Sequence, residues 1–368
     1  MKTVRRLLYR EVVIAVSMVT LGFLSLFFFF DFVEELQSVN QASALGYRIP
    51  QALIYIGLMV PSHTYELMPI TVLIGTIFVM ARLAQSSEFT ILRTSGLGPW
   101  RALRTLLSLG LAFGVFTFAV GDYLAPLADK TAQLLKARFQ GQVSVGKTGA
   151  WLKEKQSYAS YAINVGSLTS DGNMKDVRIF EFDNVGHLVS VTLGQTAVFG
   201  EHDDWVLSQV DRTEFTSAPS RAGQVDRVFS DSLRWPTGVT AEMVSAAVLR
   251  PEKMGTIDLF QYIQHLSSNN QSAQKYEIQF WKKVFYPLSC LVMVVLALPF
   301  AYFHFRSGSI ATYVFGGVMA GISFVLLNNV LSDLGTLQGW QPWFTAALPG
   351  LIYSMLSLSA FSWLVLRR

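Results

Sequence analysis

The sequence is poor in charge for its length. Charged residues make up 15% of its 368 residues, and hydrophobic residues make up 51%. Soluble proteins carry about 25% charged residues, so this deficit indicates a membrane protein. The pI near 9.1 fits basic loops at a membrane surface. Because no basic patch with interleaved aromatic residues occurs in the sequence, nucleic-acid binding is not expected.

Groups for metal binding and catalysis are also scarce. The single cysteine, Cys290, lies in an apolar run, which excludes an intrachain disulfide and a cysteine-based zinc framework. The five histidines lack paired metal-ligand spacing, and the cluster His202–Asp204 is typical of a hairpin turn. The sequence has no G-x-S-x-G motif. It therefore predicts no metal, no cofactor and no catalytic group.

One nucleotide-binding pattern occurs in an unsuitable context. Gly141–Thr148 reads GQVSVGKT and matches the P-loop pattern G-x-x-x-x-G-K-[ST]. A P-loop follows a strand and opens a helix. Here the predicted helical extension of a membrane span precedes the pattern, and Gly149–Lys153 is a predicted strand. We interpret the stretch as a glycine-rich entry into a β domain.

Long apolar runs predict six membrane spans, because one span needs about 20 apolar residues. The first run follows a basic N-terminus and has no cleavage site after it, so it is expected to be retained. The second contains Pro61 and Pro69, which predict a kink or a break, and Glu66, which should face protein or water. The runs are Val12–Phe30, Ala52–Met80, Thr105–Val120, Val284–Phe303, Ile310–Leu331 and Phe344–Leu366.

Basic residues in the short loops predict the orientation of the chain. With the N-terminus inside the cell, the inner side receives the basic residues before the first span, the arginines between the second and third spans, and the basic C-terminus. The outer short loops contain Arg48 alone. The large polar region between the third and fourth spans is then periplasmic, and both termini are cytoplasmic.

The stretch Arg82–Arg104 is a polar island between the second and third spans. It carries four arginines and one acid, Glu88. Two serines before Glu88 suit a helix N-terminus, Gly96 suits a helix end, and Pro99 suits the next helix start. The pattern predicts a short helix outside the membrane, within about residues 84–95. Two interpretations stay open: a solvated loop, or a docking helix that passes force from a soluble partner to the spans.

The polar region between the third and fourth spans has the alternation of an all-β domain. Strands are expected at Val177–Phe182, Leu188–Val191, Thr196–Phe199, Trp205–Val210 and Thr213–Phe215, with turns at Asp183–Gly186 and Glu201–Asp204. Short strands separated by such turns are typical of a sandwich or jelly roll. Its inner face would present Val177, Ile179, Leu188, Val198, Phe199, Trp205 and Leu207. Thr256–Leu266 and Ser272–Lys283 are predicted helices that lead back to the membrane.

This order of elements resembles the LptF/LptG family, the permease subunits of the lipopolysaccharide exporter. The stretches that carry the resemblance are PSHTYELMPITVLIG at Pro61–Gly75, ARLAQSSEFTILRTSG at Ala81–Gly96, and GDYLAP at Gly121–Pro126. Tyr276–Ser309 is most similar to the LptG branch. The resemblance implies a membrane α-helical fold of three plus three spans with an inserted periplasmic jelly roll. The expected domains are 1–124, with the short helix, then 125–275, the β domain, and then 276–368.

The resemblance also implies partners and a transport function. LptG pairs with LptF in the bacterial inner membrane, and two copies of the ATPase LptB bind on the cytoplasmic side. Lipopolysaccharide enters between the first span of one subunit and the fifth of the other, then passes through the jelly rolls towards LptC and LptA. The chain would be a permease subunit and not an enzyme. Glu88 matches the acid of the family's coupling helix, and the predicted ATPase contact is Glu88, Phe89, Leu92 and Arg93.

The resemblance further implies basic residues for the lipid phosphates, and here the sequence departs from the family. Lys136 falls where LptG proteins carry a basic residue, but the outer end of the first span, Asp31–Ser38, carries acids where basic residues are expected. Either other residues hold the phosphates, or the head group of the substrate differs. The predicted substrate-binding set is Lys136, Arg138, Lys130, Arg48, Lys282 and Lys283.

Two other classes of function account for part of the sequence. A membrane enzyme with a periplasmic catalytic domain would need a convergent polar constellation, which the sequence lacks. A membrane anchor that binds envelope proteins without transporting lipid does not explain the predicted inner helix or the polar residues and prolines in the spans. Co-purification of an ABC ATPase would separate the permease from both alternatives.

Overall fold

The computed structural model describes residues 2–42, 46–86, 88–94, 96, 98–140, 143–144, 149–156, 159–169, 173–200, 204–216, 224–240, 243–244, 251–269, 271–302 and 310–363. Among them are six helical segments that are long and apolar enough to cross a membrane, which confirms the six predicted spans. The first two are α1 (Lys2–Ala42) and α2 (Ile49–Gln85). The third joins α4 (Pro99–Ala119), η2 (Val120–Leu124) and α5 (Ala125–Gln140), and the last three are α8 (Gln274–Ala297), α9 (Ile310–Gln338) and α10 (Pro342–Phe361).

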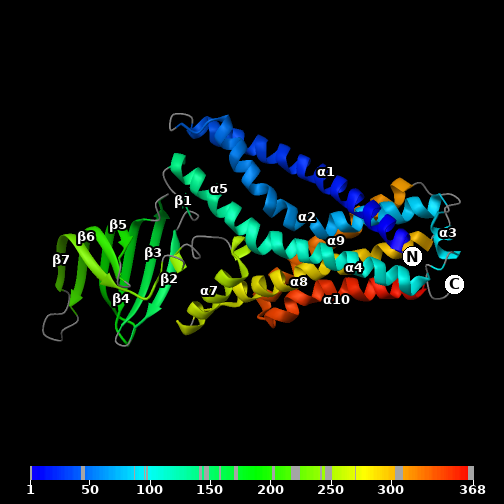
Figure 1. Ribbon diagram of the computed structural model, residues 1–368. Coiled ribbons are helices and arrows are strands. Elements are labelled where there is room, and N and C mark those ends of the chain that lie inside the picture. The colour runs from blue at the N-terminus through cyan, green and yellow to red at the C-terminus, as the bar shows by residue number, and fades with distance from the viewer. Residues whose placement is uncertain are drawn as a thin grey trace. The chain divides into compact units, whose positions relative to one another are not determined.

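The chain divides into two compact units. The helical unit comprises Met1–Glu34, Ile56–Ala128 and Glu277–Arg368, and the second unit comprises Glu35–Tyr55 and Asp129–Tyr276. The second unit therefore contains the β-sheet, most of α5, the end of α1, the start of α2, and helix α7 (Thr256–Ser268). Figure 1 labels these elements.

Glycines allow the helices of the helical unit to approach closely, as small residues do in other membrane proteins. A Cβ atom at Gly75 of α2 would lie 2.8 Å from the backbone of Val16 in α1. One at Gly114 of α4 would lie 2.9 Å from the carbonyl oxygen of Pro287 in α8. A larger residue at either glycine would push two spans apart.

The breaks around the short polar helix follow the sequence prediction. Helix α3 spans Glu88–Thr94; Gly96 then adopts a φ of +100°, and Pro99 stands in the first turn of α4. The prediction for the second span is only partly matched, because α2 stays one helix of 37 residues through Pro61 and Pro69 and shows no break.

The sheet of the second unit contains seven described strands, all paired antiparallel. They are β1 (Val143–Ser144), β2 (Ala150–Lys155), β3 (Ser160–Leu168), β4 (Met174–Phe182), β5 (Leu188–Phe199), β6 (Asp204–Thr216) and β7 (Gln224–Pro236). Strands β3 to β7 are neighbours in the order of the sequence, while β1 and β2 pair with successive parts of β3. The predicted all-β insertion between the third and fourth spans is therefore confirmed.

The sheet rolls until strands from its opposite edges meet. Glu154 of β2 accepts hydrogen bonds from Thr237 Oγ1 at 2.6 Å and from the backbone nitrogen of Gly238 at 2.8 Å, just after β7. Tyr161 of β3 packs edge-on against Trp235 of β7, with ring centroids 5.4 Å apart. An apolar core fills the space between these strands. The domain that the sequence predicts as a sandwich or jelly roll is thus one rolled sheet.

Strand boundaries differ from the prediction. Leu188–Val191 and Thr196–Phe199 belong to the single strand β5, and both segments predicted after Glu201–Asp204 belong to β6. The predicted strands do not include β3 and β7, because Asn164 interrupts the apolar alternation in β3 and charged residues interrupt it in β7. The turn at Asp183–Gly186 is present, closed by a hydrogen bond from the Gly186 nitrogen to the Asp183 carbonyl.

Two predicted motifs lie largely outside the described residues. Of the P-loop-like stretch Gly141–Thr148, the structure describes only Val143–Ser144, which pairs with β3. Helix α5 precedes the stretch and strand β2 follows it, an order opposite to the one that a P-loop requires. His202 and Asp203 also lie outside the described residues.

Candidate functional site

Helix α3 is seated on the core of its own unit by one face. Phe89 is 3% exposed and packs edge-on against Tyr302, with ring centroids 5.1 Å apart. Leu92 packs against the same core, and the Arg93 guanidinium lies 5.6 Å from the Tyr302 ring, within the range of a cation–π contact. These contacts fix the helix to the spans behind it.

The opposite face of α3 is exposed. Glu88 is exposed in the first turn, where the helix dipole favours a negative charge, and Ile91 is 62% exposed. The predicted ATPase contact is therefore divided: Glu88 and Arg93 are exposed, whereas Phe89 and Leu92 face their own chain. The apolar side chain that this helix presents outward is Ile91.

Further contacts tie the helix ends around α3 together. Arg82, near the end of α2, forms an ion pair of 2.6 Å with Glu11 of α1. Trp100, at the start of α4, packs against Phe361 at the end of α10, with ring centroids 5.9 Å apart. Figure 1 shows α3 at the end of the helical unit where α1 begins and α10 ends. These two contacts join the ends of α1 and α2 and the ends of α4 and α10 on either side of α3 in the sequence.

Lys136, the first residue of the predicted phosphate-binding set, is engaged within the second unit. Its Nζ lies 3.0 Å from Glu35 Oε2 and 4.8 Å from the centroid of the Tyr55 ring. Glu35 is 4% exposed and also accepts a hydrogen bond of 2.8 Å from the Tyr47 hydroxyl. Burial and then this hydrogen bond raise the pKa of Tyr47 above its usual range, so the hydroxyl keeps its proton and remains a donor.

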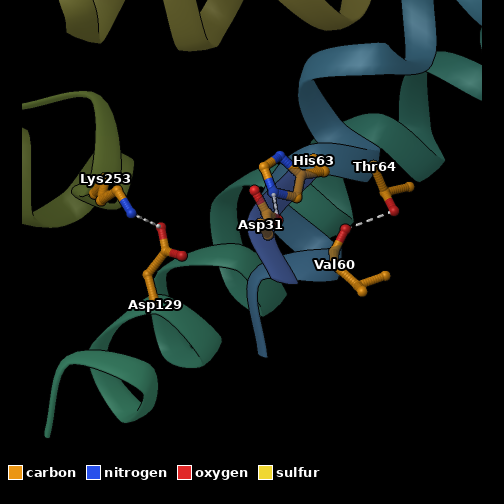
Figure 2. Close-up of polar contacts among 6 residues, drawn as sticks. All are labelled: Asp31, Val60, His63, Thr64, Asp129 and Lys253. Carbon is orange, nitrogen blue, oxygen red and sulfur yellow. Dashed lines mark hydrogen bonds and ion pairs between the residues drawn. The ribbon is translucent and has the colours of Figure 1, made fainter. Parts of the chain in front are cut away.

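Figure 2 shows two further pairs of charged or titratable residues, one in each unit. In the second unit, Lys253 lies 3.7 Å from Asp129, which is 3% exposed. In the helical unit, His63 Nε2 lies 2.8 Å from Asp31 Oδ2, linking α2 to the acidic end of α1. The acids that the sequence places near the outer end of the first span are thus largely paired within the chain.

The remaining members of the predicted phosphate-binding set have different surroundings, each described within its own unit. Lys283 is buried and donates to the carbonyl of Gly121 at 3.1 Å. Lys282 is half-buried and lines a small cavity with Ser289 and Asn328. In the second unit, Arg48 and Lys130 are exposed and form no ion pair with any described residue. Arg138 lies in α5, but its side chain is outside the described set.

The rolled sheet has an inner face that is apolar at one end and polar at the other. Of the predicted inner residues, Val177, Ile179, Trp205 and Leu207 are buried, Leu188 and Phe199 are half-buried, and Val198 is exposed. The polar part includes Glu181, which accepts from Ser190 Oγ at 2.7 Å and lies 3.3 Å from Arg212 Nη2. The sheet therefore offers apolar and polar surfaces in one fold.

Sequence reasoning missed the residues that surround Lys136. Glu35, Tyr47 and Tyr55 lie 101, 89 and 81 positions before it, so no local spacing connects them. One signal was available: a carboxylate at the end of an apolar helix is costly unless it is paired, which directs attention to a cationic partner.

Comparisons with known proteins agree with this architecture. A profile of the family described as lipopolysaccharide export system permease LptF/LptG matches residues 6–367. The chain is 28% identical over 342 residues to the lipopolysaccharide export system permease protein LptG of Escherichia coli K12, covering 92% of this chain and 90% of that protein. It is 27% identical over 328 residues to the LptG protein of Haemophilus influenzae, covering 88% and 87% of the two chains. Since the profile spans nearly the whole chain, this protein belongs to the LptF/LptG family of lipopolysaccharide export permeases.

Proposed function

We propose that the chain is the permease subunit of an ABC transporter that extracts lipopolysaccharide from the inner membrane and passes it to a periplasmic protein bridge. Its six spans and its LptG relatives point to the inner membrane. ATP hydrolysis takes place on a separate subunit. This chain supplies the path for the lipid and the mechanical link between the ATPase and the membrane spans. The observation that carries the proposal is α3, a short helix anchored on the spans with an exposed acid.

The link works through the two faces of α3. Glu88 and Ile91 meet a groove on a soluble ATPase, and Arg93 lies beside them at the edge of the contact. Phe89 and Leu92 hold the other face against the core of the helical unit. Movement of the ATPase groove is passed to the spans because α3 packs against their core.

Two spans are suited to contacts outside the chain. In α1 and α9, only 17% of the most apolar window is buried within the chain. A sister permease of the same family would cover part of these helices, and lipid would enter beside them. The remaining partners are an LptB-like ATPase dimer on the α3 side, and LptC-like and LptA-like bridge proteins next to the rolled sheet. We place both termini in the cytoplasm and the sheet in the periplasm.

The rolled sheet would receive the acyl chains after they leave the membrane. Buried apolar side chains such as Ile179 and Leu207 line its inner face, whereas Val198 points outward. A photo-crosslinker at Ile179 should capture lipopolysaccharide when ATP is added, and one at Val198 should not. Equal capture at both positions would contradict this path.

The second candidate is a scaffold that binds envelope proteins without moving lipid, and the rolled sheet alone would fit it. The two functions differ in their partners at α3. The wild-type chain, expressed with its membrane partners and purified in detergent, should retain an ABC ATPase in stoichiometric amount. Purification without any ATPase, under conditions that keep the sister permease bound, would favour the scaffold.

A further inference from the structure

One turn of the third span departs from the α-helix. Between α4 and α5, Val120–Leu124 forms the π-turn η2, and the Ala125 nitrogen that follows donates to the Val120 carbonyl. A π-turn bonds residues five apart, one more than in an α-helix, and such turns occur frequently at functional sites. The roles given above to α3 and to the rolled sheet leave this turn unexplained.

The extra residue of the π-turn decides which face of the third span is buried. A regular α-helix returns to the same face after 3.6 residues. From Thr117 onwards, buried positions instead come at every fourth residue, at Gly121, Ala125 and Asp129. If the turn were α-helical, the part of the span that follows it would be rotated by about 100°, the angle of one residue.

Helix α8 holds the π-turn through Lys283. This lysine is 7% exposed, and its ammonium donates a hydrogen bond of 3.1 Å to the Gly121 carbonyl. A buried cation in a membrane span is costly and pairs with opposite charges or with backbone carbonyls. The contact therefore fixes the lysine and one carbonyl of the irregular turn to each other.

Helix α2 closes the other side of the turn with an aromatic ring. A Cβ atom at Gly121 would overlap the ring of Tyr65, so the turn and α2 approach as closely as a glycine allows. Tyr65 packs in turn against Tyr286 of α8, with ring centroids 4.9 Å apart, and the Tyr286 hydroxyl donates to the Glu66 carbonyl at 2.6 Å. The π-turn is thus held by side chains from two other spans of the helical unit.

We propose that Lys283 is a positioning residue for lipid transport, which keeps the third span in its π-turn form and so sets the rotation of α5. Helix α5 begins directly after the turn and carries Asp129 and Lys136, both of which form ion pairs in the second unit. A span that could change its hydrogen bonding at the turn would absorb movement there and would not pass it along α5. The inference rests on the proposed function and adds a residue to its mechanism.

The first test follows the geometry of the turn. Val115 of α4 and Leu127 of α5 are exposed on either side of it within the helical unit, and cysteines at both positions can carry spin labels. Cys290 is fully buried and should take no label. In the complete complex without lipid, the wild type should give one distance between the labels and Lys283→Met a second one. A hydrogen bond from a charged group shifts an equilibrium by about tenfold, which is the expected gain of the second population.

Matched variants separate the turn from general effects of charge or size. Lys275→Met removes the same charge from an exposed position at the start of α8 and should leave a single distance. Gly121→Ala reaches the turn without changing any charge and should also produce the second distance. Gly57→Ala in α2, where a Cβ atom would meet open space, should not. Gly121→Ala keeps the test valid if Lys283→Met fails to fold.

The second test measures the ATP hydrolysed for each lipid that the complex delivers from proteoliposomes to a soluble acceptor. Lys283→Met should keep the ATPase bound and active, but the ratio should rise by about tenfold, following the shift at the turn. Lys283 also belongs to the predicted phosphate-binding set. A lysine that acted only by binding lipid would leave the label distance unchanged when lipid is absent.

Two outcomes would overturn the inference. One is a single, unchanged distance in both Lys283→Met and Gly121→Ala. The other is a second distance that appears while the ratio of ATP to lipid stays at the wild-type value. A wild-type complex that hydrolyses ATP but delivers no lipid would instead contradict the proposed function, so the two failures are distinguishable.

Discussion

Two glutamates, one in each unit of the chain, are used in opposite ways. Glu88 is exposed in the first turn of a helix that is fixed to the helical unit by Phe89. Glu35 is buried in the second unit, where it holds Lys136 and accepts from Tyr47. An exposed acid on an anchored helix is available to another protein, whereas a buried and paired acid acts on its own chain. The comparison shows that burial, more than charge, decides what an acid does in this molecule.

The largest effect is expected where the buried acid loses its cation. Lys136→Met leaves Glu35 buried beside Tyr47 alone and should lower the free energy of unfolding by about 3 kcal/mol, the lower end of the range for a broken buried pair, because Lys136 is partly exposed. Lys130→Met, at an exposed position on the same helix, should change it by less than about 0.5 kcal/mol. Chemical denaturation of the full chain in detergent measures both. Equal losses would remove the distinction between buried and exposed charges.

The exposed acid should matter for binding and not for stability. Glu88→Lys replaces attraction with repulsion and should weaken association with the ATPase by about 2–5 kcal/mol, if the cation it meets is buried in the groove. Glu88→Ala should have a smaller effect in the same direction. Thr90→Lys, also exposed on α3, serves as the control and should weaken binding less. Titration of the ATPase onto the membrane complex gives the affinities, and similar losses for Thr90→Lys and Glu88→Lys would assign the effect to bulk charge.

A third acid, Glu154, extends the comparison to the rolled sheet. It is buried and joins β2 to the segment after β7. Glu154→Ala leaves the Thr237 hydroxyl and the Gly238 N–H without this acceptor and should cost about 1–3 kcal/mol of stability. Glu214→Ala, which removes an exposed partner of Arg212, should cost at most about 1 kcal/mol. Protease resistance of the β domain in the full chain should follow the same order; a reversed order would show that Glu154 does not close the sheet.

The smallest effect concerns pH and His265 of α7. Burial lowers the pKa of His265 below its ordinary value of 6.5, against a weaker opposing effect of Glu154. The unfolded chain therefore takes up this proton first, so the contribution of His265 to stability is present above about pH 6.5 and is lost as the pH falls below it. Thermal unfolding between pH 7.5 and 5 should show a smaller acid-induced loss for His265→Phe than for the wild type. The same loss in both would place the titration elsewhere.

The spans and the short polar helix could be predicted from the sequence because their signals are local. Apolar runs of sufficient length define the six spans, and Gly96 and Pro99 mark the break after α3. Local signals do not tell which face of a seven-residue helix is buried. Because Phe89 is apolar and lies in the polar stretch, the sequence predicts that it contacts the ATPase. The structure instead packs Phe89 against Tyr302 of its own chain.

The ion pairs of the second unit could not be predicted from local signals. Glu35 and Lys136 are far apart in the sequence and are brought together by the packing of α1 and α5. From the sequence, the acids at the end of α1 indicate repulsion of phosphates. In the structure, Glu35 and Asp31 are paired with Lys136 and His63. The predicted strands omit β3 and β7 for a related reason. Asn164 of β3 donates to the carbonyl of Ala150, and Arg227 of β7 pairs with Asp211, and a linear pattern shows neither partner.

The most direct test of the central claim is ATP-driven release of lipopolysaccharide from proteoliposomes that contain this chain, its sister permease and the ATPase. The wild-type complex should transfer lipid to a soluble acceptor when ATP is added. Glu88→Lys should insert and pair with the sister permease as the wild type does, but it should transfer no lipid, either because the ATPase is lost or because hydrolysis proceeds without transport. Transfer at the wild-type level by Glu88→Lys would contradict the coupling role of α3, and the helix would then be a solvated surface element.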